Sequence, residues 1–276
     1  MSLEKPSASA SDADKTLTGD NAALIALNTA IQRRRADRSR PKFYHGRVSG
    51  RAPYSLAQLA QEQRSAGAPL PDVDFEVGMV GEHATVRRGP GLVPIANWPR
   101  PEMIEGWDRS KIIDVMGKTA EVRHGQAAVQ DARNQGDYKW SYELSEGFVA
   151  SFKDHGEAYR ASLEAELARV GVAAQVILSG EFLDFMAPGI DKGSALRAVL
   201  EELGVEEENT YTSGDSNNDR KLVLVGNAIL VANAALDFRL WAANGIPPDR
   251  LYESQKPYAG GVHEGLIHYG VLEAVA

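Results

Sequence analysis

Residues 7–20 read SASASDADKTLTGD, a run of small residues followed by two closely spaced aspartates and a threonine. In the pattern D-x-D-x-T, which Asp12 begins, one carboxylate can attack phosphorus, while the other, Asp14, protonates the leaving oxygen and later activates water. Two carboxylates so close also favour a bound cation, because each raises the pKa of the other when nothing offsets their charge. An acidic turn exposed to solvent is the alternative when this stretch is considered alone.

A second group of oxygen-bearing side chains reads GDSNND over residues 214–219. Its glycine permits a tight turn after a strand. Mg²⁺ prefers hard oxygen ligands and keeps several waters, so one carboxylate from this stretch and one from the first would be enough to hold it. An Asn/Asp-rich turn without a ligand is the alternative.

Two further places in the chain point to an anion. Lys192 opens a predicted helix in DKGS (191–194), although the helix dipole favours negative charge at that end. Ser49 and Gly50 precede another predicted helix, where a hydroxyl and free backbone N–H groups can hold a phosphate. An exposed lysine and an ordinary Ser-Gly turn are the alternatives for these two places.

Helical and extended patterns alternate along most of the chain, which predicts an α/β fold with a mainly parallel sheet. Between residues 100 and 182 the order helix, strand, helix, strand indicates a self-contained α+β unit. We therefore expect a core domain formed by 1–99 and 183–276, with a smaller domain inserted at 100–182. Apolar stripes at helical spacing mark residues 21–35, 53–64, 194–203 and 234–243.

The bulk composition is ordinary for a globular protein, with 43% hydrophobic and 25% charged residues and a formal net charge of −8. This acidic balance and the lack of a large basic patch argue against a nucleic-acid partner. No apolar run approaches the roughly 20 residues that a membrane span needs. With no cysteine, disulfides and a cysteine nucleophile are excluded. The first residues carry no apolar segment typical of a signal peptide, so we expect a cytoplasmic protein.

Taken in order, the four motifs resemble those of the haloacid dehalogenase-like (HAD) phosphatases. That superfamily carries D-x-D-x-T, a Ser or Thr after the second strand, a Lys that opens a helix, and G-D-x-x-N-D. The insert between the second and third motifs resembles the α+β cap of one subclass. The resemblance implies an α/β, Rossmann-like core with a mainly parallel sheet, plus that cap. It is nearest to the sucrose-phosphate and mannosylfructose-phosphate phosphatases, through SDADKTLTGD (11–20), GWDRSKI (106–112), YKWSYEL (138–144), APGIDKGSALR (187–197), GDSNND (214–219) and PYAGGVHEGLIHYG (257–270).

The resemblance implies an Mg²⁺-dependent phosphatase that forms an aspartyl phosphate on Asp12. Asp14 would act as general acid and then as general base, with its backbone carbonyl on Mg²⁺. Asp215 would be a metal ligand. Asp219, together with Asn218, would hold metal-bound water and the lysine of the third motif.

The remaining implied roles concern the phosphate and the sugar. Thr16, Ser49 and Gly50 would bind the phosphoryl oxygens, and Lys192 would offset negative charge on the nucleophile and the phosphate. Sugar recognition would come from the cap, where Lys139 resembles a substrate-contacting lysine. Alternation along its strand places the neighbouring aromatic residues of YKWSYEL on the opposite face, and we expect that aromatic face to form the core of the cap.

Three segments depart from the apolar pattern of central parallel strands, which are covered on both faces. These are SASAS (7–11), KFYHGRV (42–48) and NTYTS (209–213), and each precedes a motif. The second segment also offers a competing second motif at His45. We prefer Ser49, because it supplies a hydroxyl and directly precedes the helix.

The leading interpretation is a phosphatase for a small sugar phosphate, with a disaccharide phosphate such as sucrose phosphate favoured. A monosaccharide phosphate or another small phosphoester is the second interpretation. The contrasting class is a non-catalytic phosphosugar-binding module. Intact Asp12, Asp14, Lys192 and Asp215 argue against that class, since a binding module has no need of a nucleophile.

Overall fold

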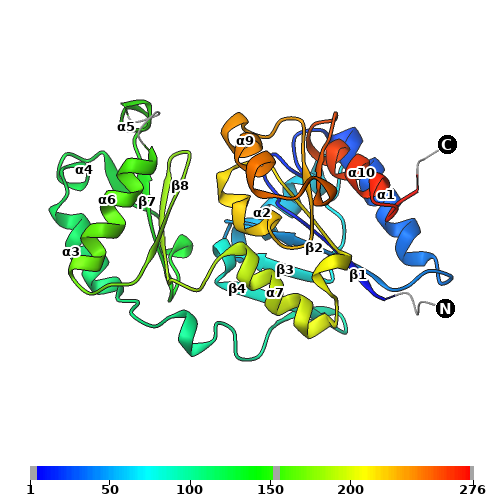
Figure 1. Ribbon diagram of the computed structural model, residues 1–276, viewed down its shortest axis with the longest axis horizontal. Coiled ribbons are helices and arrows are strands. Elements are labelled where there is room, and N and C mark those ends of the chain that lie inside the picture. Colours follow the sequence, from blue (N-terminus) through cyan, green and yellow to red (C-terminus); the bar gives the residue numbers. More distant parts are fainter. Residues whose placement is uncertain (1–4, 152–155, 274–276) are drawn as a thin grey trace. The chain divides into compact units, whose positions relative to one another are not determined.

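The computed structural model describes residues 5–151 and 156–273, and the chain divides into two units (Figure 1). Met1–Trp98 and Asp191–Ala276 together form the first, here called the core unit. Pro99–Ile190 forms the second, here called the cap unit. Among the described residues, no helix combines the length and apolar character needed to cross a bilayer.

An eight-stranded sheet forms the centre of the core unit, in the order β12-β11-β10-β1-β2-β3-β4-β5. Strands from β12 to β3 are parallel, and β4 and β5 extend one edge in antiparallel fashion. The chain runs from β1 outward through β2 to one side, and from β10 outward through β11 to the other. The fold class expected from the sequence is confirmed. The strands are β1 (Ser7–Ser11), β2 (Phe43–Val48), β3 (Phe75–Gly78), β4 (His83–Arg88), β5 (Gly91–Pro94), β10 (Thr210–Gly214), β11 (Asn227–Leu230) and β12 (Leu251–Glu253).

Two hydrophobic clusters pack on this sheet, and one short helix contributes to both. Side chains of α1, α2, α9 and α10 belong to one cluster and those of α7 to the other, while α8 contributes Val223 to the first and Leu222 to the second. α1 and α10 lie side by side in Figure 1. Helices α1, α2, α7 and α9 confirm the four predicted helices with small shifts at their ends. The helices are α1 (Asn21–Ala36), α2 (Pro53–Ser65), α7 (Lys192–Leu203), α8 (Arg220–Val223), α9 (Leu236–Gly245) and α10 (Tyr258–His268).

The polar segments before the motifs do form central strands, and in β1 small side chains alternate between the two faces. Ala8 and Ala10 of β1 are fully buried in the cluster that contains α7. On the opposite face Ser9 Oγ lies 2.8 Å from His45 Nδ1 of β2. In β10, Thr212 Oγ1 donates to a backbone carbonyl at 3.1 Å. Hydrogen bonds therefore satisfy these two hydroxyls, which would otherwise be costly to bury, whereas the buried Oγ of Ser213 in β10 has no hydrogen-bond partner.

A four-stranded antiparallel sheet, in the order β6-β7-β9-β8, forms the centre of the cap unit. Trp140 and Tyr142 of β7 pack with apolar side chains of its helices, as expected for the aromatic face. Residue 182, where the insert was expected to end, begins a strand of this sheet. The elements are α3 (Arg109–Lys118), α4 (Ala120–Arg123), β6 (Ala127–Val129), β7 (Lys139–Leu144), α5 (Glu146–Ser151), α6 (Gly156–Arg169), β8 (Gln175–Ser179) and β9 (Phe182–Met186).

Candidate active site

Three core strands end at the same edge of the sheet, and each is followed by a predicted site residue. Asp12 follows β1, Ser49 follows β2 and Asp215 follows β10. The last residue of β1, Ser11, pairs with Ser213 of β10, and the Asp12 N–H donates to the Ser213 carbonyl at 2.9 Å. β1 and β10 are also where the strand order reverses, the position at which open α/β sheets bind ligands outside the carboxyl ends of their strands.

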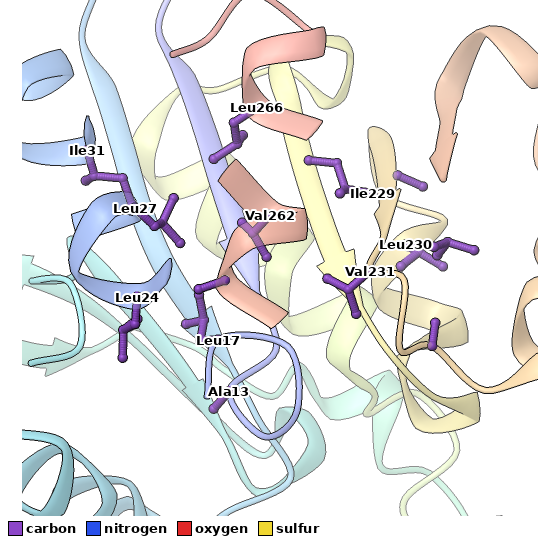
Figure 2. Packing of buried hydrophobic residues seen from close by; sticks show 14 of the residues in the cluster. Ala13, Leu17, Leu24, Leu27, Ile31, Ile229, Leu230, Val231, Val262 and Leu266 are labelled. Carbon is purple, nitrogen blue, oxygen red and sulfur yellow. The ribbon is translucent and has the colours of Figure 1, made fainter. Parts of the chain in front are cut away.

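The loop after β1 is fixed by the core on one side and contributes to the site on the other. Ala13 and Leu17 are fully buried and point into the cluster formed by α1, α10 and β11 (Figure 2). The residue between them that carries the motif hydroxyl, Thr16, donates from Oγ1 to Asp215 Oδ1 at 3.3 Å. The buried side chains of Ala13 and Leu17 therefore fix the loop, and the hydrogen bond from Thr16 joins the first motif to the fourth.

Lys192 lies at the start of α7, as predicted, and its ammonium is completely buried. Its Nζ donates to Asp12 Oδ1 at 2.8 Å, to Asp219 Oδ1 at 2.6 Å and to Asn218 Oδ1 at 3.2 Å. Burial disfavours the charged ammonium, but Asp12 and Asp219 outweigh that effect and raise the pKa of Lys192. These carboxylates are the anions that the unfavourable position of a lysine at a helix N-terminus led us to expect. Asp191 is the N-cap residue of α7, and its side chain accepts a hydrogen bond from the Ser194 N–H.

The GDSNND turn is shaped around the carboxylate of Asp219. Asp219 Oδ2 accepts the backbone N–H groups of Asp215 and Ser216 at 3.0 and 3.2 Å. A side chain on Gly214 would meet Asp219 Cβ at 2.5 Å, so glycine is required for the carboxylate to lie this close to the strand end. Asp219 therefore holds both the turn and Lys192.

Three buried carboxylates, those of Asp12, Asp215 and Asp219, each offer an oxygen within 4.8 Å of the others. Burial raises the pKa of Asp12 well above its usual value, and raises that of Asp215 to about 6, with the charge of Asp219 adding to the effect. When all three are ionised they exceed the ammonium of Lys192 by two negative charges. Hard oxygen ligands with this charge fit a divalent cation such as Mg²⁺. The Asp14 carboxylate is not part of this cluster.

Ser49 and His45, the two candidates for the second motif, have different positions in the structure. Ser49 is buried at the end of β2, and its Oγ accepts the Arg51 N–H at 3.1 Å across Gly50. His45 lies inside β2, fully buried against Ser9. Burial, followed by the nearby arginines, lowers the pKa of His45 to about 3, which keeps it neutral. His45 thus belongs to the interior of the sheet.

Two residues beside the site were assigned no role from the sequence. Arg51 donates from Nε to Asp14 Oδ2 at 2.7 Å and from Nη2 to Asp14 Oδ1 at 2.8 Å. Asn233 donates from Nδ2 to the Lys15 carbonyl at 2.7 Å and accepts the Tyr258 N–H at 2.8 Å, so it ties the first-motif loop to α10. The position of Arg51 next to the Ser-Gly turn was a usable signal. Asn233 had none, because single asparagines are common in loops.

Lys139, the predicted sugar contact, lies in β7 of the cap unit and is buried. Its Nζ lies 3.0 Å from Asp184 Oδ1 and donates to Ser141 Oγ at 2.6 Å. Ser141 Oγ also lies 2.5 Å from Asp184 Oδ1, which completes a triangle of polar groups. In this cluster one ammonium faces one carboxylate.

The overall fold is similar to that of solved HAD-superfamily structures. One from Bacteroides thetaiotaomicron has a TM-score of 0.60 at 13% identity, with 98% of this chain and 97% of that chain covered. A family model of sugar phosphatases also matches most of the chain, which makes it a HAD-like phosphatase. The family model for sucrose-6F-phosphate phosphohydrolase matches residues 6–270, and the chain belongs to this family.

Individual relatives are similar over nearly the full chain. A mannosylfructose-phosphate phosphatase from Agrobacterium fabrum is 29% identical, covering 94% of this chain and 95% of the relative. The structure of the sucrose-phosphatase from Synechocystis sp. PCC6803, in complex with sucrose and phosphate, has a TM-score of 0.78 at 25% identity. That match covers 97% of this chain and 98% of the other. The chain is accordingly a sugar-phosphate phosphatase.

Proposed function

We propose that the chain hydrolyses a disaccharide phosphate of the sucrose-phosphate type, with Mg²⁺ and through an aspartyl phosphate on Asp12. The observation that carries the proposal is the contact of Lys192 Nζ with Asp12 Oδ1 at 2.8 Å, within the cluster of three carboxylates. A buried carboxylate paired with a lysine beside a divalent-ion site suits attack on a phosphate dianion, because the cations offset the repulsion between the two anions.

The proposed reaction has two steps. In the first, an oxygen of Asp12 forms a bond to phosphorus while the bond from phosphorus to the sugar oxygen breaks, and Asp14 gives a proton to that oxygen. In the second, water attacks phosphorus and loses a proton to Asp14, and the bond to Asp12 breaks, so that orthophosphate leaves and the aspartate is restored. When bound by Asp12, Asp215 and the Asp14 carbonyl, Mg²⁺ supplies charge neutralisation at the phosphate.

The other motif residues are proposed to place the phosphate. Ser49 and Gly50 lie at the end of β2, where a hydroxyl and backbone N–H groups precede α2. Thr16 fixes Asp215 by its hydrogen bond, and Asn218 and Asp219 hold Lys192 in line with Asp12. We propose that these contacts keep the nucleophile and the phosphate within reacting distance, since phosphoryl transfer depends mainly on positioning and charge.

Lys139 is proposed to contact the sugar. One support for this role is the place of Lys139 in the cap sheet. The other is that similar proteins are a mannosylfructose-phosphate phosphatase and a sucrose-phosphatase. The Lys139 ammonium has three N–H groups, and besides Asp184 and Ser141 it donates to the Asn134 carbonyl at 3.4 Å. A sugar hydroxyl would replace this longest hydrogen bond. A neutral hydroxyl would not disturb the charge balance of the pair.

The test is phosphate release from sucrose 6F-phosphate, mannosylfructose phosphate, glucose 6-phosphate and fructose 6-phosphate, each with Mg²⁺ and with EDTA. We expect the highest kcat/KM for one of the two disaccharide phosphates and no release with EDTA. Acid-quenched protein incubated with a ³²P-labelled substrate should carry label that hydroxylamine removes, as an acyl phosphate does. A preference for a monosaccharide phosphate would refute the substrate assignment, and release that survives EDTA would refute the metal dependence.

A further inference from the structure

The carboxylate of the proposed general acid, Asp14, accepts two hydrogen bonds from Arg51. We infer that Arg51 is a positioning residue for proton transfer to the leaving sugar oxygen: its guanidinium fixes the orientation of the Asp14 carboxylate. The inference rests on the proposed function, since it assigns how one residue of that mechanism is kept in place.

The contact between the two side chains is a two-point one. Arg51 Nε lies 2.7 Å from Asp14 Oδ2 and Nη2 lies 2.8 Å from Asp14 Oδ1, so both carboxylate oxygens are engaged. The third nitrogen, Nη1, donates to Ser55 Oγ of α2 at 2.9 Å. A planar fork of this kind sets the plane of a carboxylate as well as its distance, which a single hydrogen bond does not do.

In the described part of the chain, Arg51 is the one side chain that restrains this carboxylate. The Asp14 side chain is 43% exposed, and within residues 5–151 and 156–273 no other side chain bonds to it. The other two motif side chains are bonded to residues of the third and fourth motifs: Asp12 to Lys192, and Thr16 to Asp215. Without Arg51, Asp14 would exchange among rotamers in solvent. Misplacement of a reacting group by about 1 Å can cost about 10²-fold in rate.

The backbone that carries Arg51 is itself tied down by an unusual turn. The Arg51 N–H donates to Ser49 Oγ, and its carbonyl accepts the Met79 N–H at 2.8 Å. The Val80 N–H donates to the Ser49 carbonyl at 3.1 Å. Met79 and the β-branched Val80 both have positive φ values, 51° and 59°, although both are buried. Such conformations persist where surrounding contacts impose them. In this turn they direct the N–H groups of Met79 and Val80 toward the backbone carbonyls of Arg51 and Ser49.

The fork is compatible with proton transfer. Each carboxylate oxygen has two lone-pair positions, and Arg51 uses one on each. The second position on either oxygen remains for the proton that Asp14 exchanges with the leaving sugar oxygen. Arg51 therefore acts through Asp14 and need not contact the substrate.

The test is a double-mutant cycle in kcat for sucrose 6F-phosphate with Mg²⁺. Arg51→Gln, which removes the fork and the charge, should lower kcat about 30- to 100-fold with KM changed less than about threefold, because general acid catalysis contributes about 10²–10⁴-fold. In an Asp14→Asn background the same Arg51→Gln change should alter kcat by less than about threefold, since the group that Arg51 positions is already lost. Arg51→Lys, which keeps the charge without the fork, should recover only part of the loss.

Ser55→Ala is the matched control, because Ser55 contacts the arginine nitrogen that does not bond to Asp14, and its kcat should stay within about threefold of wild type. Equal losses from Arg51→Gln in the wild-type and Asp14→Asn backgrounds, or a rise in KM with kcat unchanged, would overturn the inference and indicate direct contact with the substrate. If wild-type protein releases no phosphate from any sugar phosphate, the proposed function itself fails, which is a different result from an active enzyme that tolerates Arg51→Gln.

Discussion

Two buried lysines, one in each unit, differ in the charge balance of their surroundings. Lys192 in the core unit faces Asp12 and Asp219, with Asp215 within the same 4.8 Å cluster, so carboxylates outnumber the ammonium. Lys139 in the cap unit pairs with the carboxylate of Asp184 and donates to two neutral acceptors, Ser141 Oγ and the Asn134 carbonyl. An excess of buried charge is costly unless a further ion offsets it, whereas a balanced pair needs none. The first cluster therefore fits the charged parts of the reaction, the metal and the phosphate, and the second fits a neutral sugar.

The largest contrast should come from the same substitution made in the two clusters. Asp12→Asn removes the nucleophile and should lower kcat for the sugar phosphate at least about 10⁴-fold, as loss of a covalent nucleophile does in other enzymes. Asp184→Asn keeps the nucleophile and should lower kcat less than about tenfold while raising KM. Steady-state phosphate release measures both. Comparable losses of kcat in the two variants would remove the distinction between the clusters.

Replacing each lysine tests the charge argument through stability. Lys192→Met leaves several buried carboxylates without their ammonium and should lower the free energy of unfolding by about 3–5 kcal/mol. Mg²⁺ should restore part of this loss, because it offsets the same carboxylates. Lys139→Met should also destabilise the protein, but Mg²⁺ should not repair it. Urea denaturation of each variant with and without Mg²⁺ gives the four free energies of unfolding. If Mg²⁺ stabilised both variants equally, the assignment of the metal to the core cluster would be contradicted.

Mg²⁺ binding should stabilise the wild-type protein in proportion to its saturation. At a concentration 100 times the Kd, a ligand that binds only the folded state adds about 2.7 kcal/mol. Asp215→Asn should abolish the rise in Tm on adding Mg²⁺, because one ligand oxygen of the cluster loses its charge. Ser141→Ala in the cap cluster is the control and should keep that rise. An unchanged rise in Asp215→Asn would place the ion elsewhere.

The smallest expected effect concerns a buried group without an ionic partner, His45. Burial lowers its pKa from 6.5 to about 3, so the unfolded chain takes up a proton below pH 6.5 that the folded protein excludes until near pH 3. Stability from this group is therefore present above pH 6.5 and is lost as the pH falls toward 3. Between pH 7 and pH 5, wild type should lose up to about 2 kcal/mol more than His45→Gln. Parallel pH dependence of unfolding in the two proteins would show that His45 is not the source.

Much of the site was predictable because it depends on rules that act over short stretches. The helix from Asn21 follows from its apolar stripe and from Asp20, whose side chain accepts the Ala23 N–H at 3.0 Å. The strand ends and motif residues could be brought together in advance because carboxyl ends of parallel strands share one edge of a sheet. The preference for Ser49 over His45 followed from the place of Ser49 at a helix start.

The remaining contacts could not be predicted, because nothing local selects the partners. Arg51 meets Asp14 across 37 residues, and Lys139 meets Asp184 across the pairing of β7 with β9. The polar segment SASAS departs from the apolar pattern of a central strand. The segment forms β1 because Ser9 contacts His45 and because Ala8 and Ala10 pack in the cluster that contains α7. Both contacts depend on strand register.

The amino-acid order by itself determined the four motifs, their sequence along the chain, the helices and the excess of carboxylates near one edge of the sheet. These follow from side-chain chemistry and from periodicities of a few residues. The folded structure alone decided which lysine stays charge-balanced, which arginine holds Asp14, and how polar strands are satisfied inside the sheet. Such pairings depend on strand register and on the packing of segments far apart in the chain, so no local pattern specifies them.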